Sequence, residues 1–571
     1  MPYRAPVGEF QYIFDHVVDL GKVAQTPLFA EVTRDVTDAI LSEAGRLSEE
    51  VIAPVQRNGD LDPAVLENGV LRSSRGFAGA YAQIAQGGWV GMAAGPEHGG
   101  MGLPMTVATA VNDMMGAACL SLQLNPLLTQ GQIEALEHHA CPGMKALYLP
   151  KLISGEWNGT MNLTEPQAGS DVGAVAAKAV PNDDGTYAVT GQKIFISWGD
   201  CDFTSNTCHL VLARLPDAAP GTRGISLFMV PKLIPDAQGN PGVANSLKVV
   251  SLEHKLGLHG SPTAVMQFDG ATGWLVGEPH KGMAAMFTMM NNARLGVGVQ
   301  GIGAAEGAYQ HALAYALERR QGKTPVAEGT GCIVDHADVR RMLTTMKAEI
   351  FAARTLALSC ALAIDLARAT DDADCLARAA FLTPIAKAYG TDTGIDVASM
   401  GMQVHGGMGF IEESGAAQYL RDVRVTAIYE GTNGIQAMDL VGRKMMDGGE
   451  AAFRLMDEVE ASAEAARGTL PDLAIAVWAA AETLREATEW LATQQMNDRF
   501  AGAVPFLRGF ARVLGAHFHL KAALAEGGSG PRTALATFFI RRLLPEHVAL
   551  LAHAREGAAG LYALSPEDLV A

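Results

Sequence analysis

The sequence predicts an α+β fold in which one central, strand-rich segment lies between helical segments. Three observations support this prediction. The 571 residues exceed what one compact core usually holds, so several domains are expected. Apolar residues recur at helical spacing before residue 157 and after residue 282, whereas the segment between them shows alternation and β-branched residues. The composition, 49% hydrophobic and 18% charged, is that of a globular chain with ample material for large cores.

The first helical segment covers residues 30 to about 155. One apolar stripe consists of Val32, Val36, Ile40, Leu41, Ala44, Leu47 and Val51. Glycines between Gly95 and Gly102, and the proline at Pro126, are expected to divide the segment into several helices.

The strand-rich segment begins near Trp157 and ends near Gly277. The predicted strands are residues 186–197, 209–215, 225–230, 248–252 and 264–268. No long helical pattern interrupts them, so they are expected to form a compact β domain.

Helical periodicity returns at Gly282 and continues to the end of the chain. Long Ala- and Leu-rich helices are predicted over 296–320 and 337–368, and Asp447-Gly-Gly is a predicted break. Further helices are expected beyond Glu450, for example over 473–481 and 506–525. The predicted domains are an N-terminal extension (1–35), a helical domain (36–157), a β domain (158–280), a second helical domain (281–447) and a C-terminal helical extension (448–571).

Charge and cysteine content limit the classes of function. The net charge is -18, with 43 basic and 61 acidic residues, which argues against nucleic-acid binding but leaves room for a locally basic cofactor pocket. The seven cysteines show no C-x-x-C spacing, so we expect buried, reduced thiols and no metal site. The first residues do not resemble a secretory signal, and apolar stretches such as Leu473–Ala481 are too short to span a membrane. A soluble, cytoplasmic protein is expected.

Several motifs, in the right order, resemble those of one family. Residues 162–171 read NLTEPQAGSD, and residues 428–436 read IYEGTNGIQ. Residues 403–410 read QVHGGMGF, residues 315–319 read YALER, and an Arg-Asp pair stands at 421–422. These motifs are similar to signatures of the acyl-CoA dehydrogenases, and the resemblance covers roughly residues 36 to 447. It implies a β domain between two helical domains, as the sequence pattern indicates independently.

The resemblance implies that Glu430 is the catalytic base. An acyl thioester is oxidised by loss of an α-proton and a β-hydride. The weakly acidic α-proton requires a desolvated carboxylate, and the hydride requires a flavin because no side chain accepts it. Taken alone, a Glu after a Tyr would be a solvated surface acid; the IYEGT context favours the catalytic role. Some relatives place the base just before Arg294, where this chain has Ala293, which cannot act as a base.

The resemblance also implies residues for the cofactor and the substrate. FAD is expected to contact Thr164, Phe195, Ser197, Arg319, Gln403, Gly406, Gly407 and Thr432, with Arg319 meeting the FAD pyrophosphate of a neighbouring subunit. The acyl-CoA substrate is expected to contact Ser170, Asn291, Arg294 and Gly431. The alternative for Arg294 is an ion pair with an acid on a neighbouring helix. Phe195 and Ser197 depart from the W-x-T of many relatives: the aromatic ring and a hydroxyl remain, but the indole N–H is lost.

Departures from the common family pattern favour one subgroup. Residues 320–323 read RQGK where many relatives read x-x-F-G, so the phenylalanine that packs beside FAD is absent, and an insertion at 324–333 follows. Residues 1–35 and 448–571 exceed the usual length. Such extensions resemble the larger bacterial subgroup that includes methylmercaptopropionyl-CoA dehydrogenase. They imply 3-(methylthio)propionyl-CoA and similar short acyl-CoAs as substrates, electron-transfer flavoprotein as electron acceptor, and a homodimer. The alternatives are an acyl-CoA oxidase that uses oxygen, a medium- or long-chain acyl-CoA dehydrogenase, and a non-catalytic CoA- or flavin-binding scaffold.

Overall fold

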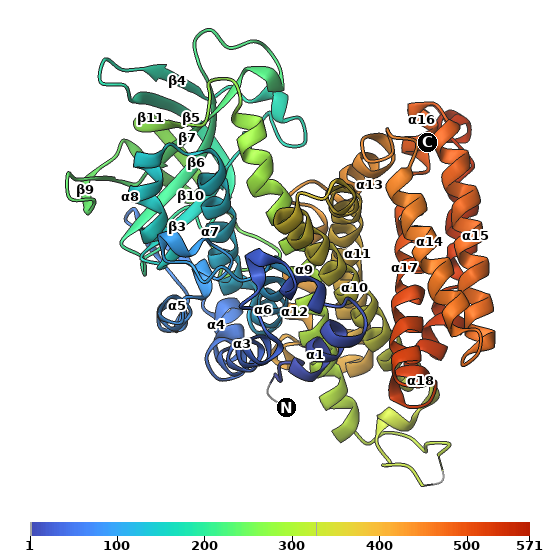
Figure 1. Cartoon of the computed structure of the whole chain (residues 1–571). Coiled ribbons are helices and arrows are strands. Elements are labelled where there is room, and N and C mark those ends of the chain that lie inside the picture. Colours follow the sequence, from blue (N-terminus) through green and yellow to red (C-terminus); the bar gives the residue numbers. More distant parts are fainter. Residues whose placement is uncertain (1–2, 327, 571) are drawn as a thin grey trace.

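The computed structural model describes residues 3–326 and 328–570 and has the predicted α+β architecture. Figure 1 shows the strands gathered at one end of the molecule, two sets of helices in the middle, and the helices beyond residue 450 on the opposite side. The prediction of a helical N-terminal part, a central β domain, a helical C-terminal part and further helices is therefore confirmed.

The N-terminal part is helical apart from one short hairpin. Its helices are α1 (Val7–His16), α2 (Gly21–Ala24), α3 (Arg34–Leu47), α4 (Gln56–Leu61), α5 (Phe77–Gln86), α6 (Met105–Ala118), α7 (Leu120–His139) and α8 (Pro142–Ile153). Strands β1 (Val65–Glu67) and β2 (Val70–Arg72) form the hairpin. The predicted break at Pro126 is wrong, because α7 continues through it. A proline inside a helix costs about 3 kcal/mol; burial of neighbouring side chains such as Leu122 and Leu127 offsets that cost.

The β domain is a seven-stranded sheet that closes on itself. Its strands are β3 (Trp157–Asn162), β4 (Lys178–Pro181), β5 (Tyr187–Ser197), β6 (Asn206–Arg214), β7 (Ile225–Pro231), β10 (Leu247–Leu252) and β11 (Thr263–Val276), with β8 (Leu233–Pro235) and β9 (Pro241–Ala244) in a separate hairpin. β4 pairs with β5 and β6, and β7 pairs with β6 and β11, so that β11, β5, β4, β6 and β7 form a ring. Each of the five predicted strands corresponds to one of these elements.

The central helical bundle follows the sheet. Its helices are α9 (Gly282–Glu318), α10 (Ala337–Thr370), α11 (Ala373–His405), α12 (Ala416–Val423) and α13 (Asn433–Gly442). By length and composition α10 contains an 18-residue window apolar enough for a membrane span, more apolar than sequence inspection indicated, but 78% of that window is buried inside the protein. Such burial is expected of the core helix of a bundle.

Glycines let α9 and α11 touch backbone to backbone. A Cβ on Gly301 would lie 2.3 Å from the carbonyl oxygen of Gly390, and a Cβ on Gly390 would lie 2.4 Å from that of Gly298. Any larger residue would force the helices apart. This close approach brings the side chains at the edges of the two helices, among them Arg294 and Lys387, near one loop.

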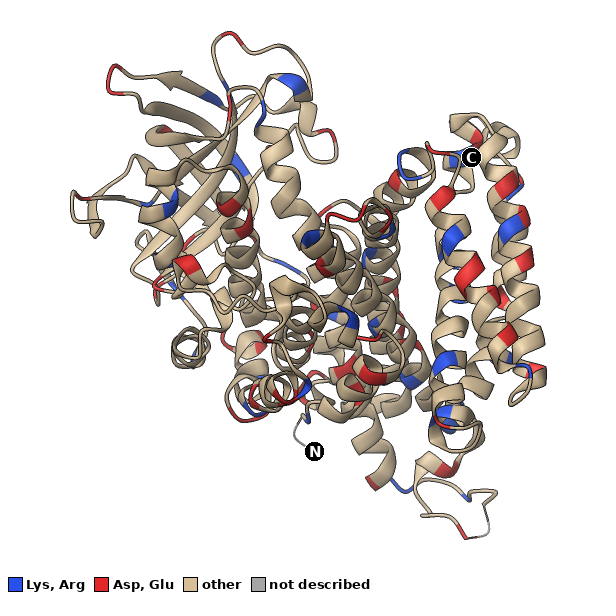
Figure 2. Cartoon of the chain, viewed as in Figure 1, with Lys and Arg blue, Asp and Glu red and all other residues tan. Residues whose placement is uncertain are grey.

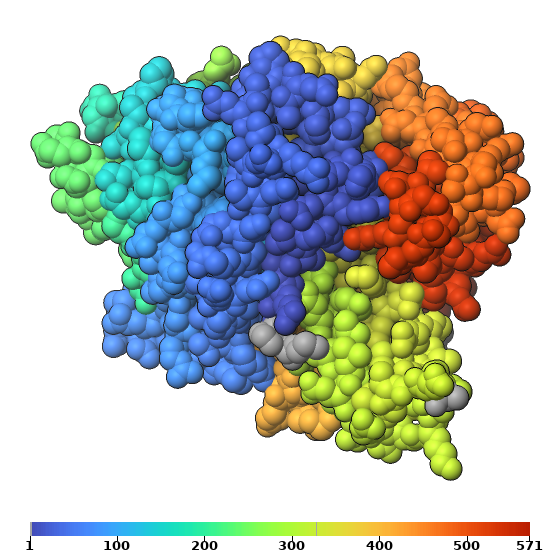
Figure 3. Space-filling model, turned by 60° about the horizontal axis from the view of Figure 1, so that its bottom comes forward, coloured from blue at the N-terminus to red at the C-terminus, as the bar shows by residue number. Residues whose placement is uncertain are grey.

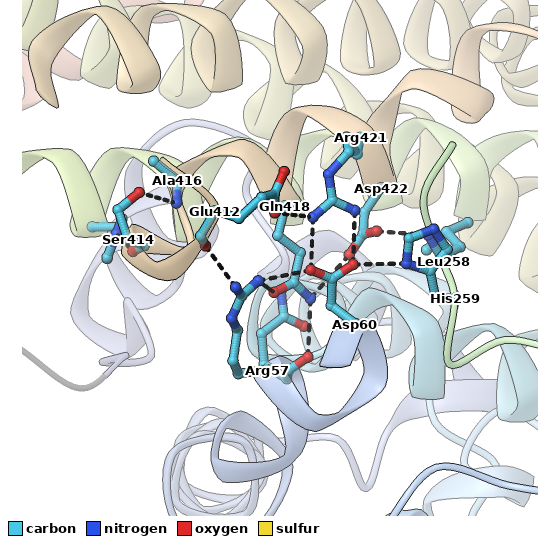
Figure 4. A network of polar contacts seen from close by, with 12 residues as sticks. Arg57, Asp60, Leu258, His259, Glu412, Ser414, Ala416, Gln418, Arg421 and Asp422 are labelled. Carbon is cyan, nitrogen blue, oxygen red and sulfur yellow. Dashed lines mark hydrogen bonds and ion pairs between the residues drawn. The ribbon is translucent and has the colours of Figure 1, made fainter. Parts of the chain in front are cut away.

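A polar network joins the N-terminal helices, the β domain and the central bundle (Figure 4). Arg421 on α12 donates two hydrogen bonds to Asp60 on α4, at 2.7 and 2.6 Å. His259, in the loop before β11, lies 2.9 Å from the same carboxylate. The adjoining Asp422 accepts a hydrogen bond from the backbone of Leu258 at 2.6 Å. The Arg421-Asp422 pair therefore fixes the three parts relative to one another.

The helices beyond residue 450 pack against the bundle and against the first helix of the chain. They are α14 (Glu450–Ala466), α15 (Pro471–Thr493), α16 (Met496–Ala501), α17 (Ala503–Ala525), α18 (Pro531–Phe538) and α19 (Glu546–Ala554). The hydroxyl of Tyr12 on α1 donates to the carbonyl of Ala522 on α17 at 2.7 Å. Figure 3 shows this first segment, in dark blue, lying against both the other N-terminal helices and the red C-terminal ones.

Ion pairs anchor α1 from both sides. Glu9 on α1 pairs with Arg354 on α10 at 2.6 Å and with Arg532 on α18 at 3.1 Å. Arg354 also pairs with Asp113 on α6 at 2.8 Å and with Glu306 on α9 at 3.0 Å. The cluster thus ties four helices of the interior to the C-terminal helices.

The prediction that the cysteines are buried holds for five of the seven. All seven are free thiols, but Cys141 is exposed and Cys375 is half-buried. Figure 2 shows Lys and Arg scattered through every part of the chain among Asp and Glu.

Candidate active site

Glu430 lies in the loop between α12 and α13, in a strained backbone conformation. Its φ is 56°, and that of the following Gly431 is 85°. A non-glycine residue in the left-handed region is uncommon and is held there by its surroundings, often at functional sites. Thr432 caps α13 through a hydrogen bond from the backbone of Ile435 at 3.2 Å, and Gln436 donates to the carbonyl of Glu430 at 3.3 Å. The helix that follows therefore holds this loop in place.

Two groups of Glu430 remain available for a ligand. Within residues 3–326 and 328–570, its half-buried carboxylate accepts no hydrogen bond, and its backbone N–H donates none. Burial raises the pKa of this carboxyl to about 7, although Arg294 and Lys387 act to lower it. A carboxyl with such a pKa can accept a proton near neutral pH, which is what a general base requires.

Two buried cations face Glu430 from α9 and α11. Arg294 is 6% exposed, lies 3.7 Å from Asp439 on α13, and has no hydrogen-bond partner for its Nε among the described residues. Lys387 is fully buried and donates to the side chain of Asn433 at 2.9 Å; burial lowers its pKa to about 8, although Glu430 acts to raise it. Arg294 therefore forms the ion pair that was the alternative prediction, but the contact with Asp439 is long. Its Nε has no partner among the described residues.

A second group of predicted residues lies on the β domain. The carbonyl of Thr164, just beyond β3, accepts a hydrogen bond from Ile194 on β5 at 2.9 Å. The buried Lys193 holds the adjoining Glu165 at 2.7 Å. Phe195 follows with a φ of 61° and a side chain that is 60% exposed, and Ser197 is half-buried two residues further on. Ser170 lies exposed in the loop that begins at Thr164.

A third group lies at the far end of the bundle. Arg319 caps the end of α9, and the exposed residues Gln403, Gly406 and Gly407 lie at the end of α11. His405 stacks on Tyr315 with ring centroids 4.5 Å apart, which joins the two helix ends. The 25 residues of helix between Arg294 and Arg319 correspond to roughly 37 Å. Residues of this group are therefore remote from Glu430 of the same chain.

Sequence reasoning missed three side chains near Glu430, of which Lys387 and Gln300 are buried and Asn433 is half-buried. Lys387 on α11 donates to Asn433 at the start of α13 at 2.9 Å, and Gln300 on α9 accepts a hydrogen bond from the hydroxyl of Tyr429 at 2.5 Å. One signal was available: a lysine and a glutamine stand within otherwise apolar, Ala- and Gly-rich helical runs. Asn291, predicted to contact the CoA arm, is exposed on α9 one turn before Arg294.

Comparison with known proteins identifies the class of this fold and site. The model of the acyl-CoA dehydrogenase N-terminal domain matches residues 36–156, that of the middle domain 160–271, and that of the C-terminal domain 280–446. An acetyl-CoA dehydrogenase C-terminal-like model matches residues 455–565. The chain belongs to the acyl-CoA dehydrogenase family, whose members are flavoproteins, and is therefore an oxidoreductase.

Individual relatives make the likeness more specific. The chain is 45% identical over 96% of its length to 3-methylmercaptopropionyl-CoA dehydrogenase of Ruegeria pomeroyi, and the match covers 97% of that protein. It is 37% identical to a butyryl-CoA dehydrogenase of Syntrophomonas wolfei, over 77% of this chain and 75% of that one. Among solved structures, Caenorhabditis elegans ACDH-11 in complex with C11-CoA has the same fold, with a TM-score of 0.77 at 21% identity over 92% of this chain and 90% of that one. The resemblance predicted from the motifs is confirmed.

Proposed function

We propose that the protein catalyses FAD-dependent α,β-dehydrogenation of a short acyl-CoA to the trans-2-enoyl-CoA, with Glu430 as the base. The observation that carries this proposal is a half-buried carboxylate with a pKa near 7 and no hydrogen-bond donor among the described residues, in a strained loop. The backbone N–H of Glu430, which also has no partner there, would bind the thioester carbonyl. An enolate that develops on that oxygen would be stabilised by this N–H while Glu430 takes the α-proton.

The buried cations have distinct tasks in this proposal. Arg294, with its free Nε, would contact the CoA arm together with Asn291, while Ser170 and Gly431 would contact the substrate from the two adjoining loops. Lys387 would hold the loop through Asn433 and keep the charge of the base compensated. A substrate that excludes water here strengthens each of these interactions.

Residues on the β domain fit a flavin ring. The Phe195 ring is 60% exposed at a positive φ, next to half-buried Thr164 and Ser197, so its apolar face is available to a planar group. Thr164, Phe195, Ser197 and Thr432 would therefore hold the ring. When bound, FAD supplies the hydride acceptor that no side chain can provide.

Arg319, Gln403, Gly406 and Gly407 would hold the phosphate and adenosine part of the FAD of a second subunit. Roughly 37 Å of helix separates this group from Arg294 beside the base, which favours a cofactor bound between two chains. Arg319→Ala is expected to lower FAD retention and dimer stability together. A fully flavinated, unchanged dimer from this variant would refute the role.

For the substrate we propose 3-(methylthio)propionyl-CoA. Butyryl-CoA should react almost as well, because a thioether sulfur resembles a methylene in size and polarity. The likeness to the Ruegeria pomeroyi and Syntrophomonas wolfei enzymes supports this choice. Electrons would pass to an electron-transfer flavoprotein; the alternative acceptor is oxygen, as in an acyl-CoA oxidase.

The decisive experiment is a spectral titration of the purified flavoprotein. Thioether, straight-chain and branched acyl-CoAs are added anaerobically, and loss of the flavin absorbance is followed. Bleaching by short acyl-CoAs supports the proposal, and no bleaching by any of them refutes it. Turnover with an electron-transfer flavoprotein compared with oxygen then separates dehydrogenase from oxidase.

A further inference from the structure

A chain of hydrogen bonds leads from the buried Lys387 to a half-buried carboxylate on the same helix. Lys387 donates to the side-chain oxygen of Asn433 at 2.9 Å, and the side-chain NH₂ of Asn433 donates to Asp392 at 2.7 Å. The hydroxyl of Thr391 also bonds the Asn433 amide, at 3.0 and 3.2 Å from its nitrogen and oxygen. Asn433 is the first residue of α13, just beyond the loop of Glu430. The chain therefore joins α11 to the end of that loop.

The two ends of this chain fix the direction in which the Asn433 amide points. An ammonium group can only donate hydrogen bonds, so Lys387 requires the amide oxygen. An ionised carboxylate can only accept them, so Asp392 requires the amide NH₂. Both bonds involve a charged group and are therefore stronger than bonds between neutral groups. Asp392 thus holds the oxygen of Asn433 towards Lys387.

The charge of Lys387 depends on the groups around it. Its side chain is fully buried, and Asn433 accepts a hydrogen bond from its ammonium. Burial lowers the pKa of Lys387 to about 8, the carboxylates of Glu430 and Asp392 act to raise it, and Arg294 acts to lower it. Without Asp392 this pKa would fall towards that of Glu430, which is about 7. Lys387 would then lose part of its charge in the pH range in which Glu430 titrates.

The C-terminal extension acts on Asp392 in turn. Burial raises the pKa of Asp392, whereas the bond from Asn433 acts to lower it, together with the cations Arg508 on α17, Lys387 and Arg424. Arg508 and Asp392 line the same cavity of about 50 Å³, where α10, α11 and α17 meet. Arg508 therefore favours the ionised form of Asp392, which is the form that orients Asn433.

We infer that Asp392 is a positioning residue for the reaction: through Asn433 it holds the Lys387 ammonium, in its charged form, beside Glu430. The inference rests on the proposed function and adds a residue that acts on the base from two hydrogen bonds beyond Lys387. The charges that act to lower the pKa of Glu430 are those of Arg294 and Lys387. A weaker Lys387 charge therefore raises this pKa, whereas direct removal of a nearby negative charge would lower it. The sign of the change distinguishes action through Lys387 from direct action.

The test is the pH profile of the limiting rate of flavin reduction by saturating butyryl-CoA, in wild type and in Asp392→Asn, from about pH 5.5 to about pH 9. The midpoint of the profile is expected to move up by about 0.5 unit or more in the variant, which slows reduction at the acid end about threefold or more. The rate at the alkaline plateau is expected to stay unchanged. Flavin content and the thermal midpoint are measured alongside. A loss of rate shared equally by all pH values would show a structural role alone and overturns the inference.

Asp396→Asn is the matched control. Asp396 lies one turn further along α11 and lines the same cavity, but the hydrogen bond of Asn433 goes to Asp392. The pH profile of this variant is expected to match that of wild type. A shift as large as that of Asp392→Asn would show that any carboxylate in the cavity has the same effect, and it overturns the assignment to Asp392.

A second comparison places Lys387 between Asp392 and the base. Lys387→Met removes the cation and is expected to move the midpoint up as well. Asp392→Asn added to Lys387→Met is expected to cause no further shift, because the two residues act through one contact. A further shift equal to that of Asp392→Asn alone would show that Asp392 acts independently of Lys387.

One more variant keeps the test decisive. If Asp392→Asn retains no flavin, Asn433→Ser breaks the chain at its centre and is expected to give the same upward shift. An unchanged or lowered midpoint in Asp392→Asn, or in Asn433→Ser where it replaces that variant, overturns the inference. Failure of every acyl-CoA to reduce the wild type would instead refute the proposed function.

Discussion

Two buried arginines in neighbouring helices of the bundle have opposite surroundings. Arg354 on α10 is 1% exposed and has three carboxylates within 3.0 Å, those of Glu9, Asp113 and Glu306. Although burial alone would lower the pKa of its guanidinium, these carboxylates raise it well above the usual value. Arg294 on α9 has one carboxylate at 3.7 Å and an Nε without a partner among the described residues, and burial lowers its pKa.

This difference distinguishes an arginine that holds helices together from one that remains available to a ligand. A buried charge with all its partners stabilises one arrangement of helices and has nothing left to offer a ligand. A buried charge with free donors is costly for the fold, and such groups persist where a ligand completes their contacts. Arg354 is of the first kind and joins the extensions to the core. Arg294 is of the second kind and lies beside Glu430, the proposed base.

The largest effect is expected at the base itself. Glu430→Gln keeps the shape of the side chain but cannot accept the α-proton, so flavin reduction should slow by about 10³-fold or more. Stopped-flow reduction with butyryl-CoA measures this. FAD content and acyl-CoA affinity should remain close to those of the wild type, and near-normal reduction would refute the assignment.

The next largest effect concerns stability. Arg354→Met leaves the carboxylates of Glu9, Asp113 and Glu306 buried without their cation, which should lower the free energy of unfolding by about 3–5 kcal/mol. Urea denaturation at neutral pH measures it. A change below about 1 kcal/mol would show that the cluster is not the anchor that the comparison requires.

Arg294→Met should have little effect on stability but a large effect on activity. It removes a cation whose contacts within the protein are poor, so the stability should change by less than about 1 kcal/mol. A lost charge-assisted contact to the substrate should lower kcat/KM by about 10- to 100-fold. Steady-state kinetics and urea denaturation of the same preparation measure both. A loss of stability as large as that of Arg354→Met would remove the distinction between the two arginines.

The smallest expected effect is the pH dependence of flavin reduction and of stability. Since burial raises the pKa of Glu430 to about 7, the rate of flavin reduction in wild type should rise with pH and level off above about 7. The same shift means that ionisation of Glu430 destabilises the fold as pH rises from its ordinary pKa through 7. Glu430→Gln should therefore gain stability relative to wild type between pH 5 and pH 8. Equal stability differences at both pH values would contradict the shift.

The helices and strands could be predicted well, because the spacing of apolar residues that favours each of them lies within its own segment. Alternation over 186–197 corresponds to β5, and the Ala- and Leu-rich run over 337–368 corresponds to α10. Pro126 misled the prediction because burial on both sides of α7 outweighs its missing hydrogen bond. The short β4, with only four residues, has too few positions to show a period.

The site could be predicted only where a motif carried it. The IYEGT motif pointed to Glu430, which the structure places beside buried cations. Lys387 and Gln300 lie 46 and 129 residues from their partners Asn433 and Tyr429. These contacts depend on the glycine-mediated approach of α9 and α11 and on the bundle around it, which no local pattern encodes.

The contact between Glu9 and Arg532 has a consequence for how the chain is made. The two residues are 523 positions apart, and synthesis proceeds at about 5–20 residues per second, so Glu9 waits roughly 30–100 s for this partner. During that time the apolar face of α1, with Phe10, Ile13 and Phe14, lacks part of its final cover. Until residue 532 has been synthesised, the nascent chain therefore leaves part of this apolar face exposed, and exposed apolar surface of this kind promotes aggregation before folding is complete.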